Sequence, residues 1–163
     1  MSRSGFERAR RAFEPAIRRV LHLYWRLTRG MTLGVRAVVV DDQRRIFLVK
    51  HSYVSGWHLP GGGVEVGETA LQAITRELRE EGNIDVTEPP RLHGIFFNDR
   101  DSRRDYVALF VVSGFRQDAA PVPNLEIIAH GFFPVDGMPN DTTAGTRARV
   151  IEVFGGAPIS ERW

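Results

Sequence analysis

The chain has 163 residues, of which 42% are hydrophobic and 26% are charged, a composition typical of one globular domain. It contains no cysteine, which excludes a disulfide bond, a thiolate zinc site and a cysteine nucleophile and agrees with the cytoplasmic location that we expect. No apolar run reaches the roughly 18 residues that a membrane-spanning helix needs.

The positive charge is concentrated at the start of the chain. Residues 1–30 hold eight arginines and two glutamates, a net charge of +6, whereas the whole chain carries +2. Apolar side chains recur there every three or four residues, which predicts an amphipathic basic helix over residues 6–28. They are Phe13, Ile17, Val20, Leu21, Tyr24 and Leu27. We expect residues 1–30 to form a helical extension that packs on the domain or in a homodimer. Alternatively, it contacts an anionic membrane or RNA.

The next segments have the pattern of short strands. Residues 32–40 predict a strand, and residues 46–50 predict its hairpin partner after a turn at 41–43. Residues 57–59 predict a short strand that leads into Gly61, Gly62 and Gly63. Glycines let the backbone approach a ligand closely and adopt positive φ angles, so this turn is a candidate ligand-binding loop.

A helix with an acidic face is expected after the glycine turn. Thr69 is a suitable N-cap, and Leu71, Ile74 and Leu78 form an apolar stripe at helical spacing.

Three glutamates, Glu77, Glu80 and Glu81, stand at i, i+3 and i+4, so their side chains share one face. Like charges at this spacing repel by roughly 0.2–0.5 kcal/mol per pair, and they lie near the helix end that disfavours negative charge. A bound divalent cation removes this conflict, and carboxylate oxygens are the ligands that Mg²⁺ or Mn²⁺ prefers.

The rest of the chain has the pattern of three further strands followed by a closing helix. Strands are expected at residues 91–97, 105–114 and 131–135, and a closing helix at 144–154. The histidines His51, His93 and His130 show no metal-binding spacing. The chain therefore predicts an α+β (α/β) domain.

The segment GGVEVGETALQAITRELREEGNI, residues 62–84, resembles the Nudix box of the Nudix (MutT-like) hydrolases. The matching positions are Gly62, Glu68, Arg76, Glu77, Leu78, Glu80, Glu81 and Ile84. Asn83 stands where the family pattern has its second glycine, and asparagine is the next best residue for a left-handed helix cap. The resemblance implies a Nudix-like mixed sheet sandwiched between helices, within a Nudix hydrolase domain over residues 31–163.

The resemblance also implies roles for individual residues. Members cleave a phosphoanhydride bond of a nucleoside diphosphate linked to a moiety X, with Mg²⁺ or Mn²⁺ as cofactor. By position, the metal ligands would be Glu77, Glu80, Glu81 and the carbonyl of Gly61.

Two further groups of residues follow from the resemblance and its surroundings. Glu68 and Arg76 are similar to the pair that braces the loop against the helix. Family members take their catalytic base from a box glutamate or from a later loop, so the catalytic candidates are Glu77, Glu80 and Glu126. Weaker candidates for substrate binding are Tyr53, Trp57, Arg103 and Arg104, with Arg100 in the same basic loop as the last two.

Other functions remain open at this point. The basic N-terminal segment slightly favours an RNA 5′-pyrophosphohydrolase, and its apolar stripe leaves room for an enzyme of lipid-linked or sugar diphosphates at a membrane surface. A non-catalytic Nudix-like binding module would require lost metal ligands, whereas all three helix glutamates are present.

Overall fold

The structure is a computed structural model that describes residues 18, 20–21, 23–25, 27–100, 102–122 and 125–163. The chain divides into two compact units, Met1–Met31 and Thr32–Trp163. In the first unit, the described residues between 18 and 28 are helical, while Phe13 and Ile17 of the expected apolar stripe lie outside the described residues. No helix that the described residues form is long and apolar enough to cross a membrane.

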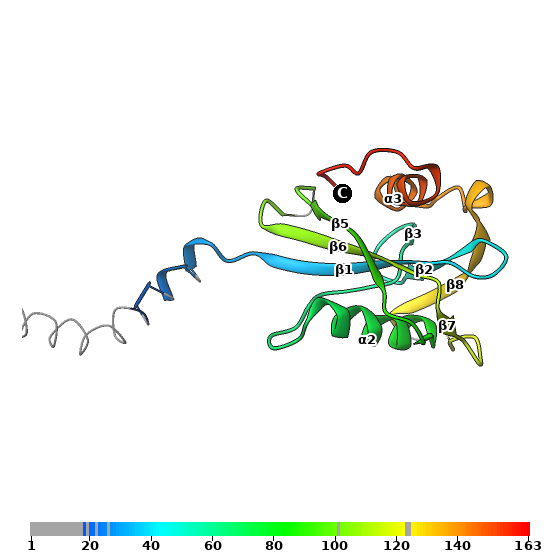
Figure 1. Ribbon diagram of the computed structural model, residues 1–163, viewed down its shortest axis with the longest axis horizontal. Coiled ribbons are helices and arrows are strands. Elements are labelled where there is room, and N and C mark those ends of the chain that lie inside the picture. Colours follow the sequence, from blue (N-terminus) through cyan, green and yellow to red (C-terminus); the bar gives the residue numbers. More distant parts are fainter. Residues whose placement is uncertain (1–17, 19, 22, 26, 101, 123–124) are drawn as a thin grey trace, which may run out of the picture. The chain divides into compact units, whose positions relative to one another are not determined.

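The second unit contains two three-stranded sheets and a small strand pair (Figure 1). The first sheet is mixed: β1 runs parallel to the central strand β6, and β5 runs antiparallel to it. Its strands, in sheet order, are β1 (Thr32–Val39), β6 (Asp105–Val112) and β5 (Arg91–Phe97). The second sheet is antiparallel and is made of β3 (Trp57–His58), β2 (Arg45–His51) and β8 (Ile127–Pro134). The pair consists of β4 (Asp85–Val86) and β7 (Phe115–Arg116).

Two α-helices lie on opposite sides of these strands (Figure 1). They are α2 (Ala70–Gly82) and α3 (Ala144–Gly155), and a short 3₁₀ helix, η1 (Val135–Gly137), follows β8. Side chains alternate between the two faces of β1: Val35 and Ala37 pack in a cluster with α2, whereas Val38 packs in a second cluster with α3. This arrangement confirms the expected mixed sheet structure between helices.

The local signals for α2 agree with the structure. The Thr69 side chain accepts a hydrogen bond from the Gln72 backbone N–H, and Gln72 reaches back to the Thr69 N–H, which forms a capping box. Asn83 ends the helix with φ of 49° in the left-handed region. The expected apolar stripe is partly wrong, because Leu71 is exposed and Ala73 is buried with Ile74 and Leu78.

The expected hairpin of residues 32–40 and 46–50 is also wrong. β1 and β2 belong to different sheets, and the bridge between Val40 and Ile46 is the one point where the two segments pair within the described chain. β1 pairs instead with β6, more than 70 residues later. The last strand begins at Ile127 rather than at residue 131, because residues 127–130 pair with the end of β2. These pairings are long-range, which local turn signals do not report.

Candidate active site

The acidic face of α2 lies against the glycine loop. The Gly61 backbone N–H donates a hydrogen bond to Glu81 Oε2 at 2.7 Å. A Cβ atom at Gly62 would collide with the Glu77 carboxylate, and one at Gly61, where φ is 140°, would collide with the Val35 carbonyl oxygen. Glycine is therefore required at Gly61, where the obstacle is backbone, whereas at Gly62 the obstacle is the movable end of the Glu77 side chain.

Arg76 connects the loop to the acidic face. Its guanidinium donates to both carboxylate oxygens of Glu68, at 3.0 and 3.1 Å, and to Glu77 Oε1 at 2.7 Å. It also donates to Glu80 Oε2 and to the Gly63 carbonyl oxygen, each at 3.2 Å. One planar cation thus offsets the repulsion between neighbouring carboxylates and fixes their orientation.

The three helix glutamates differ in burial. The Glu80 side chain is 59% exposed, the Glu77 side chain is mostly buried, and Glu81 is buried. Burial raises the pKa of Glu81 to about 7, against the lowering effect of the Gly61 N–H and of Arg36. Burial likewise raises the pKa of Glu77, which Arg76 counteracts. Nearby positive charge would therefore favour the ionised form of both groups.

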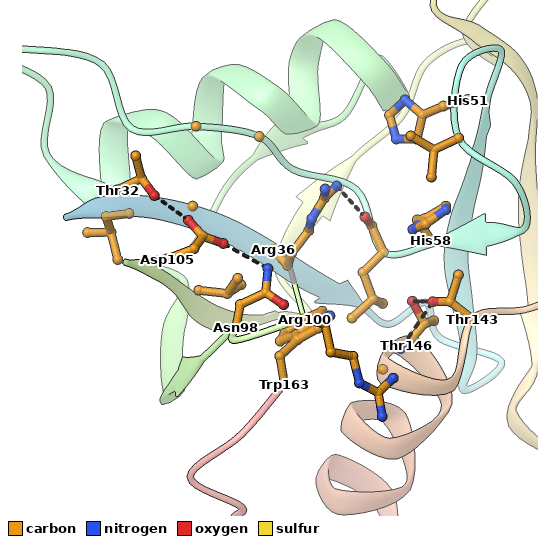
Figure 2. Close-up of a pocket in the computed structure, with 18 of the residues that line it drawn as sticks. Thr32, Arg36, His51, His58, Asn98, Arg100, Asp105, Thr143, Thr146 and Trp163 are labelled. Carbon is orange, nitrogen blue, oxygen red and sulfur yellow. Dashed lines mark hydrogen bonds between the residues drawn. The ribbon is translucent and has the colours of Figure 1, made fainter. Parts of the chain in front are cut away.

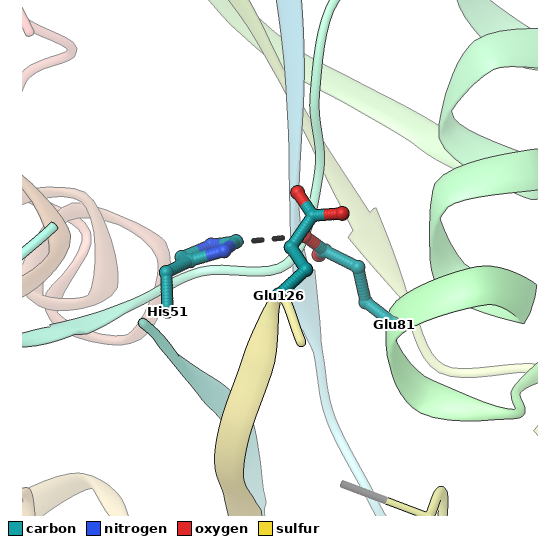
Figure 3. Close-up of side chains that lie close together, drawn as sticks. All are labelled: His51, Glu81 and Glu126. Atoms are coloured by element: carbon teal, nitrogen blue, oxygen red, sulfur yellow. Dashed lines mark ion pairs between the residues drawn. The ribbon is translucent and has the colours of Figure 1, made fainter. Parts of the chain in front are cut away.

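His51 joins this acidic region (Figure 3). It lies at the end of β2, and its Nε2 is 3.6 Å from Glu81 Oε1. One ligand atom each from His51, Glu81 and Glu126 lie within 4.8 Å of one another. His51 is only 6% exposed, and both of its ring nitrogens lack a hydrogen-bond partner among the described residues. Burial and the nearby Arg36 lower its pKa, so the neutral imidazole, which can bind a metal ion, is favoured.

The donors on these elements fit a divalent cation. Carboxylate oxygens are preferred by Mg²⁺ and Mn²⁺, and an imidazole nitrogen is accepted by Mn²⁺ and later transition metals. Sequence spacing gave no metal role to His51. The cluster is formed by the end of β2, the last turn of α2 and the residue before β8. The long-range pairing of β2 with β8 brings His51 and Glu126 together, and the contact of α2 with the glycine loop adds Glu81.

Glu126 has a second polar neighbour. The Tyr53 hydroxyl donates to Glu126 Oε1 at 2.9 Å. Partial burial raises the pKa of Tyr53, and the hydrogen bond to Glu126 adds to this effect. The tyrosine therefore remains a hydrogen-bond donor at neutral pH and orients the carboxylate.

A cavity of about 660 Å³ begins at the glycine loop. Its lining includes Gly62, Gly63, Arg36 and Arg100. Figure 2 shows Arg36 between His51 on one side and Trp163 on the other. The Arg36 guanidinium donates to the Leu59 and Gly61 carbonyl oxygens, at 3.0 and 2.5 Å. Arg36 was not predicted as a site residue from the sequence. The one signal for it is an arginine within an otherwise apolar strand.

Some of the substrate-binding residues predicted from the sequence line this cavity, and others do not. Tyr53 and Arg100 line it, whereas Trp57, Arg103 and Arg104 are not among its lining residues. The Trp57 ring packs edge-on against Phe133, with centroids 4.9 Å apart, at the margin of the core. A substrate role for Trp57, Arg103 and Arg104 remains a prediction.

Comparison with known proteins identifies the same family that residues 62–84 resemble. A family model, the NUDIX domain, matches residues 30–154. A MutT NUDIX hydrolase from Burkholderia pseudomallei superposes with a TM-score of 0.66 at 26% identity, over 76% of this chain and 98% of that one.

Two curated relatives have names that indicate their substrates. An RNA pyrophosphohydrolase of Legionella pneumophila is 43% identical over 56 residues, which are 34% of this chain and 32% of that protein. The match thus spans about a third of that relative's length. A putative 8-oxo-dGTP diphosphatase of Bacillus subtilis is 27% identical over 111 residues, which are 67% of this chain and 74% of that protein.

Proposed function

Because this chain belongs to the Nudix family, we propose that it is a divalent-metal-dependent hydrolase that cleaves the phosphoanhydride bond of a nucleoside diphosphate linked to another group. One observation carries the proposal. The acidic face of α2 and the cavity meet at the glycine loop: Gly61 is hydrogen-bonded to Glu81, and Gly62 and Gly63 line the cavity.

The metal ligands in this proposal are Glu77, Glu80, Glu81 and the Gly61 carbonyl. A bound Mg²⁺ or Mn²⁺ neutralises charge on the phosphate oxygens and activates the attacking water. Arg76 holds two of these carboxylates, and the Gly61 N–H holds the third. The three carboxylates are therefore positioned before a substrate binds, which reduces the cost of reorganisation during the reaction. The Gly61 carbonyl oxygen accepts a hydrogen bond from Arg36 at 2.5 Å, and a metal ion at this oxygen would share or replace that bond.

The remaining roles fall to residues around the cavity. Glu126 is the proposed general base, since it is exposed and the Tyr53 hydroxyl orients it; Glu77 and Glu80 are the alternatives within the box. Arg36 and Arg100 line the cavity and provide positive charge for the phosphate groups of the substrate. The proposed substrate is a small nucleotide derivative.

An RNA 5′-end pyrophosphohydrolase is the second candidate. It is favoured by the 43% identity with the Legionella pneumophila protein over 56 residues and by the basic charge of residues 1–30. This reaction would use the same glutamates, so the substrate alone distinguishes it from the first candidate.

A substrate screen tests both candidates. Phosphate or nucleotide release would be measured for sugar nucleotides, ADP-ribose, dinucleoside polyphosphates, oxidised and normal nucleoside triphosphates, and 5′-triphosphorylated RNA, each with Mg²⁺ and with EDTA. We expect metal-dependent turnover of at least one small nucleotide. Turnover of RNA alone would favour the second candidate, and no metal-dependent turnover of any substrate would support a binding module instead.

Glutamine substitutions test the metal site. Glu81→Gln keeps an oxygen that can accept the Gly61 N–H bond, but it removes the charge that a cation requires. We expect its kcat to fall by at least about 100-fold with little change in melting temperature, comparable to the loss of a major electrostatic group. Glu88→Gln, an exposed change outside the site, is the matched control. Full activity of Glu81→Gln, or of the wild type in EDTA, would refute the metal assignment.

A further inference from the structure

The segment that follows α3 returns to the cavity along the edge of β5. The Phe97 backbone N–H donates to the Glu161 carbonyl oxygen at 2.8 Å, and the Trp163 N–H donates to the Phe97 carbonyl oxygen at 3.1 Å. Arg162 forms a parallel bridge with Phe97. Residues 161–163 thus extend the first sheet by a short strand, and backbone bonds of this kind fix the register of a segment.

A buried ion pair anchors the same segment. Arg149 and Glu152, both on α3, are 3% and 8% exposed. Arg149 donates to Glu152 Oε1 and to the Arg162 carbonyl oxygen, each at 2.5 Å, and Glu152 Oε1 accepts the Ser160 backbone N–H at 3.1 Å. Burying two charges is costly unless their hydrogen bonds are made. Two of these three bonds go to the segment, so the ion pair depends on the segment being docked, while Arg149 Nε and Glu152 Oε2 have no hydrogen-bond partner among the described residues.

This anchoring places the Trp163 indole in the wall of the cavity (Figure 2). The ring is edge-on to Phe96, with centroids 5.8 Å apart, and the Arg149 guanidinium lies 5.9 Å from its centroid. A Cβ atom added at Gly145 would lie 2.6 Å from Trp163 Nε1, so the ring fits tightly over the start of α3. The half-buried indole leaves part of its surface for a ligand.

The neighbouring groups suit a heterocyclic ligand. Asn98 and Arg100 line the cavity with Trp163, and Arg162 forms an ion pair with Asp99, in the turn between them. The glycine loop and Arg36 line the same cavity, next to the carboxylates proposed to hold the metal. A nucleotide with its phosphates near Arg36 would direct its base away from the carboxylates and toward Trp163.

We propose that residues 160–163 are a functional part of the substrate pocket, and that Trp163 determines specificity by packing against the nucleobase of the substrate. This inference rests on the proposed function, because it identifies what that site accepts. An aromatic side chain that stacks on a base contributes affinity with little preference among bases. Trp163 therefore favours nucleotides over base-free diphosphates without itself choosing one base.

Binding of small phosphates tests the inference without turnover. The four nucleoside monophosphates AMP, GMP, CMP and UMP, and ribose 5-phosphate, which lacks only the base, would be titrated by calorimetry in Mg²⁺ buffer. In the wild type, we expect at least one monophosphate to bind more tightly than ribose 5-phosphate. In Trp163→Ala, we expect its affinity to fall by about ten-fold or more, with ribose 5-phosphate unchanged.

Four further variants separate an effect on nucleobase binding from an effect on folding. Ile159→Ala truncates an exposed side chain of the same segment that does not line the cavity, and it should leave nucleotide binding unchanged. Trp163→Leu keeps an apolar side chain against Phe96 but no ring, and should bind like Trp163→Ala. Trp163→Phe should restore much of the affinity. If Trp163→Ala does not fold, the same titrations are made with Trp163→Leu and with Gly145→Ala, which displaces the ring.

Several outcomes would overturn the inference. The first is equal nucleotide affinity in folded Trp163→Ala and wild type. The second is an equal loss of affinity for ribose 5-phosphate, which would indicate a purely structural role. The third is failure of the wild type to bind any of the four monophosphates. Failure of the proposed function is a distinct outcome, because hydrolysis would then be absent while these binding equilibria could still be measured.

Discussion

Arg76 is the residue whose contacts best explain why an acidic helix face is tolerated. Its guanidinium reaches the three carboxylates of Glu68, Glu77 and Glu80 and one backbone carbonyl. Two of the carboxylates are on its own helix and one is in the loop, so this contact joins the two elements. Glu81 lies outside this group and depends on the Gly61 N–H instead.

Replacing Arg76 should affect stability and metal affinity together. Arg76→Ala leaves Glu77 mostly buried without its charged partner, and a lost charged hydrogen bond costs about 1–3 kcal/mol. We expect a lower melting temperature and weaker Mn²⁺ binding, measured by calorimetry on the same sample. Arg76→Lys keeps the charge but loses the planar fork, so it should recover only part of both effects. Wild-type melting and metal affinity in Arg76→Ala would show that the contact has no structural role.

The contact between Arg76 and Glu68 also predicts a pH dependence. Hydrogen bonds from Arg76 lower the pKa of Glu68 below its ordinary value of 4.5. A carboxylate with a lowered pKa stabilises the folded state above its unfolded pKa, and this contribution disappears as the pH falls through the folded pKa. Chemical denaturation of wild type and Glu68→Gln from pH 7 to about pH 3 should therefore give a constant difference above about pH 5 that shrinks below it. A difference that grows on acidification would contradict this assignment.

Among the elements, helix α2 was the most predictable from the sequence. Its N-cap at Thr69, its end at Asn83 and the shared face of its glutamates are consequences of residues within one or two turns of each other. The sheets were less predictable, since β1 pairs in parallel with a strand more than 70 residues away. The same limit applies to the site: the pairing of β2 with β8 brings His51 and Glu126 together, and Glu81 joins them from α2, which no local pattern encodes.

The end of the box helix provides a prediction about stability. Asn83 has φ of 49°, and its side chain donates to the Ala119 carbonyl oxygen at 2.9 Å. Asn83→Ala places a Cβ-bearing residue without a local polar group in the left-handed region, which costs about 1–2 kcal/mol. We expect that loss in thermal or urea unfolding, with unchanged kcat, because Asn83 contacts none of the proposed ligands. Asn83→Gly, which removes the steric cost, should lie closer to wild type, and equal stability of both variants would refute the argument.

At the scale of the whole chain, the first unit presents an apolar surface that requires an explanation. Its described apolar side chains are exposed, with Val20 at 67% and Leu27 at 70%, and residues 1–30 carry eight arginines. An exposed apolar row of this size favours association with another surface. The candidates are the second unit, a second copy of the chain, an anionic membrane and RNA.

A variant that starts at Gly30 distinguishes these candidates. The proposed metal ligands and the cavity lining lie between Thr32 and Trp163, so we expect the variant to retain hydrolysis but to lose stability or a dimer contact. Sedimentation and melting of both forms would measure this loss. Binding of several arginines to phosphate or anionic lipid weakens steeply with ionic strength, so RNA and liposome binding at two salt concentrations tests the rival view. Salt-sensitive binding that disappears in the variant, with unchanged melting and oligomeric state, would replace packing by RNA or membrane contact as the role of residues 6–28.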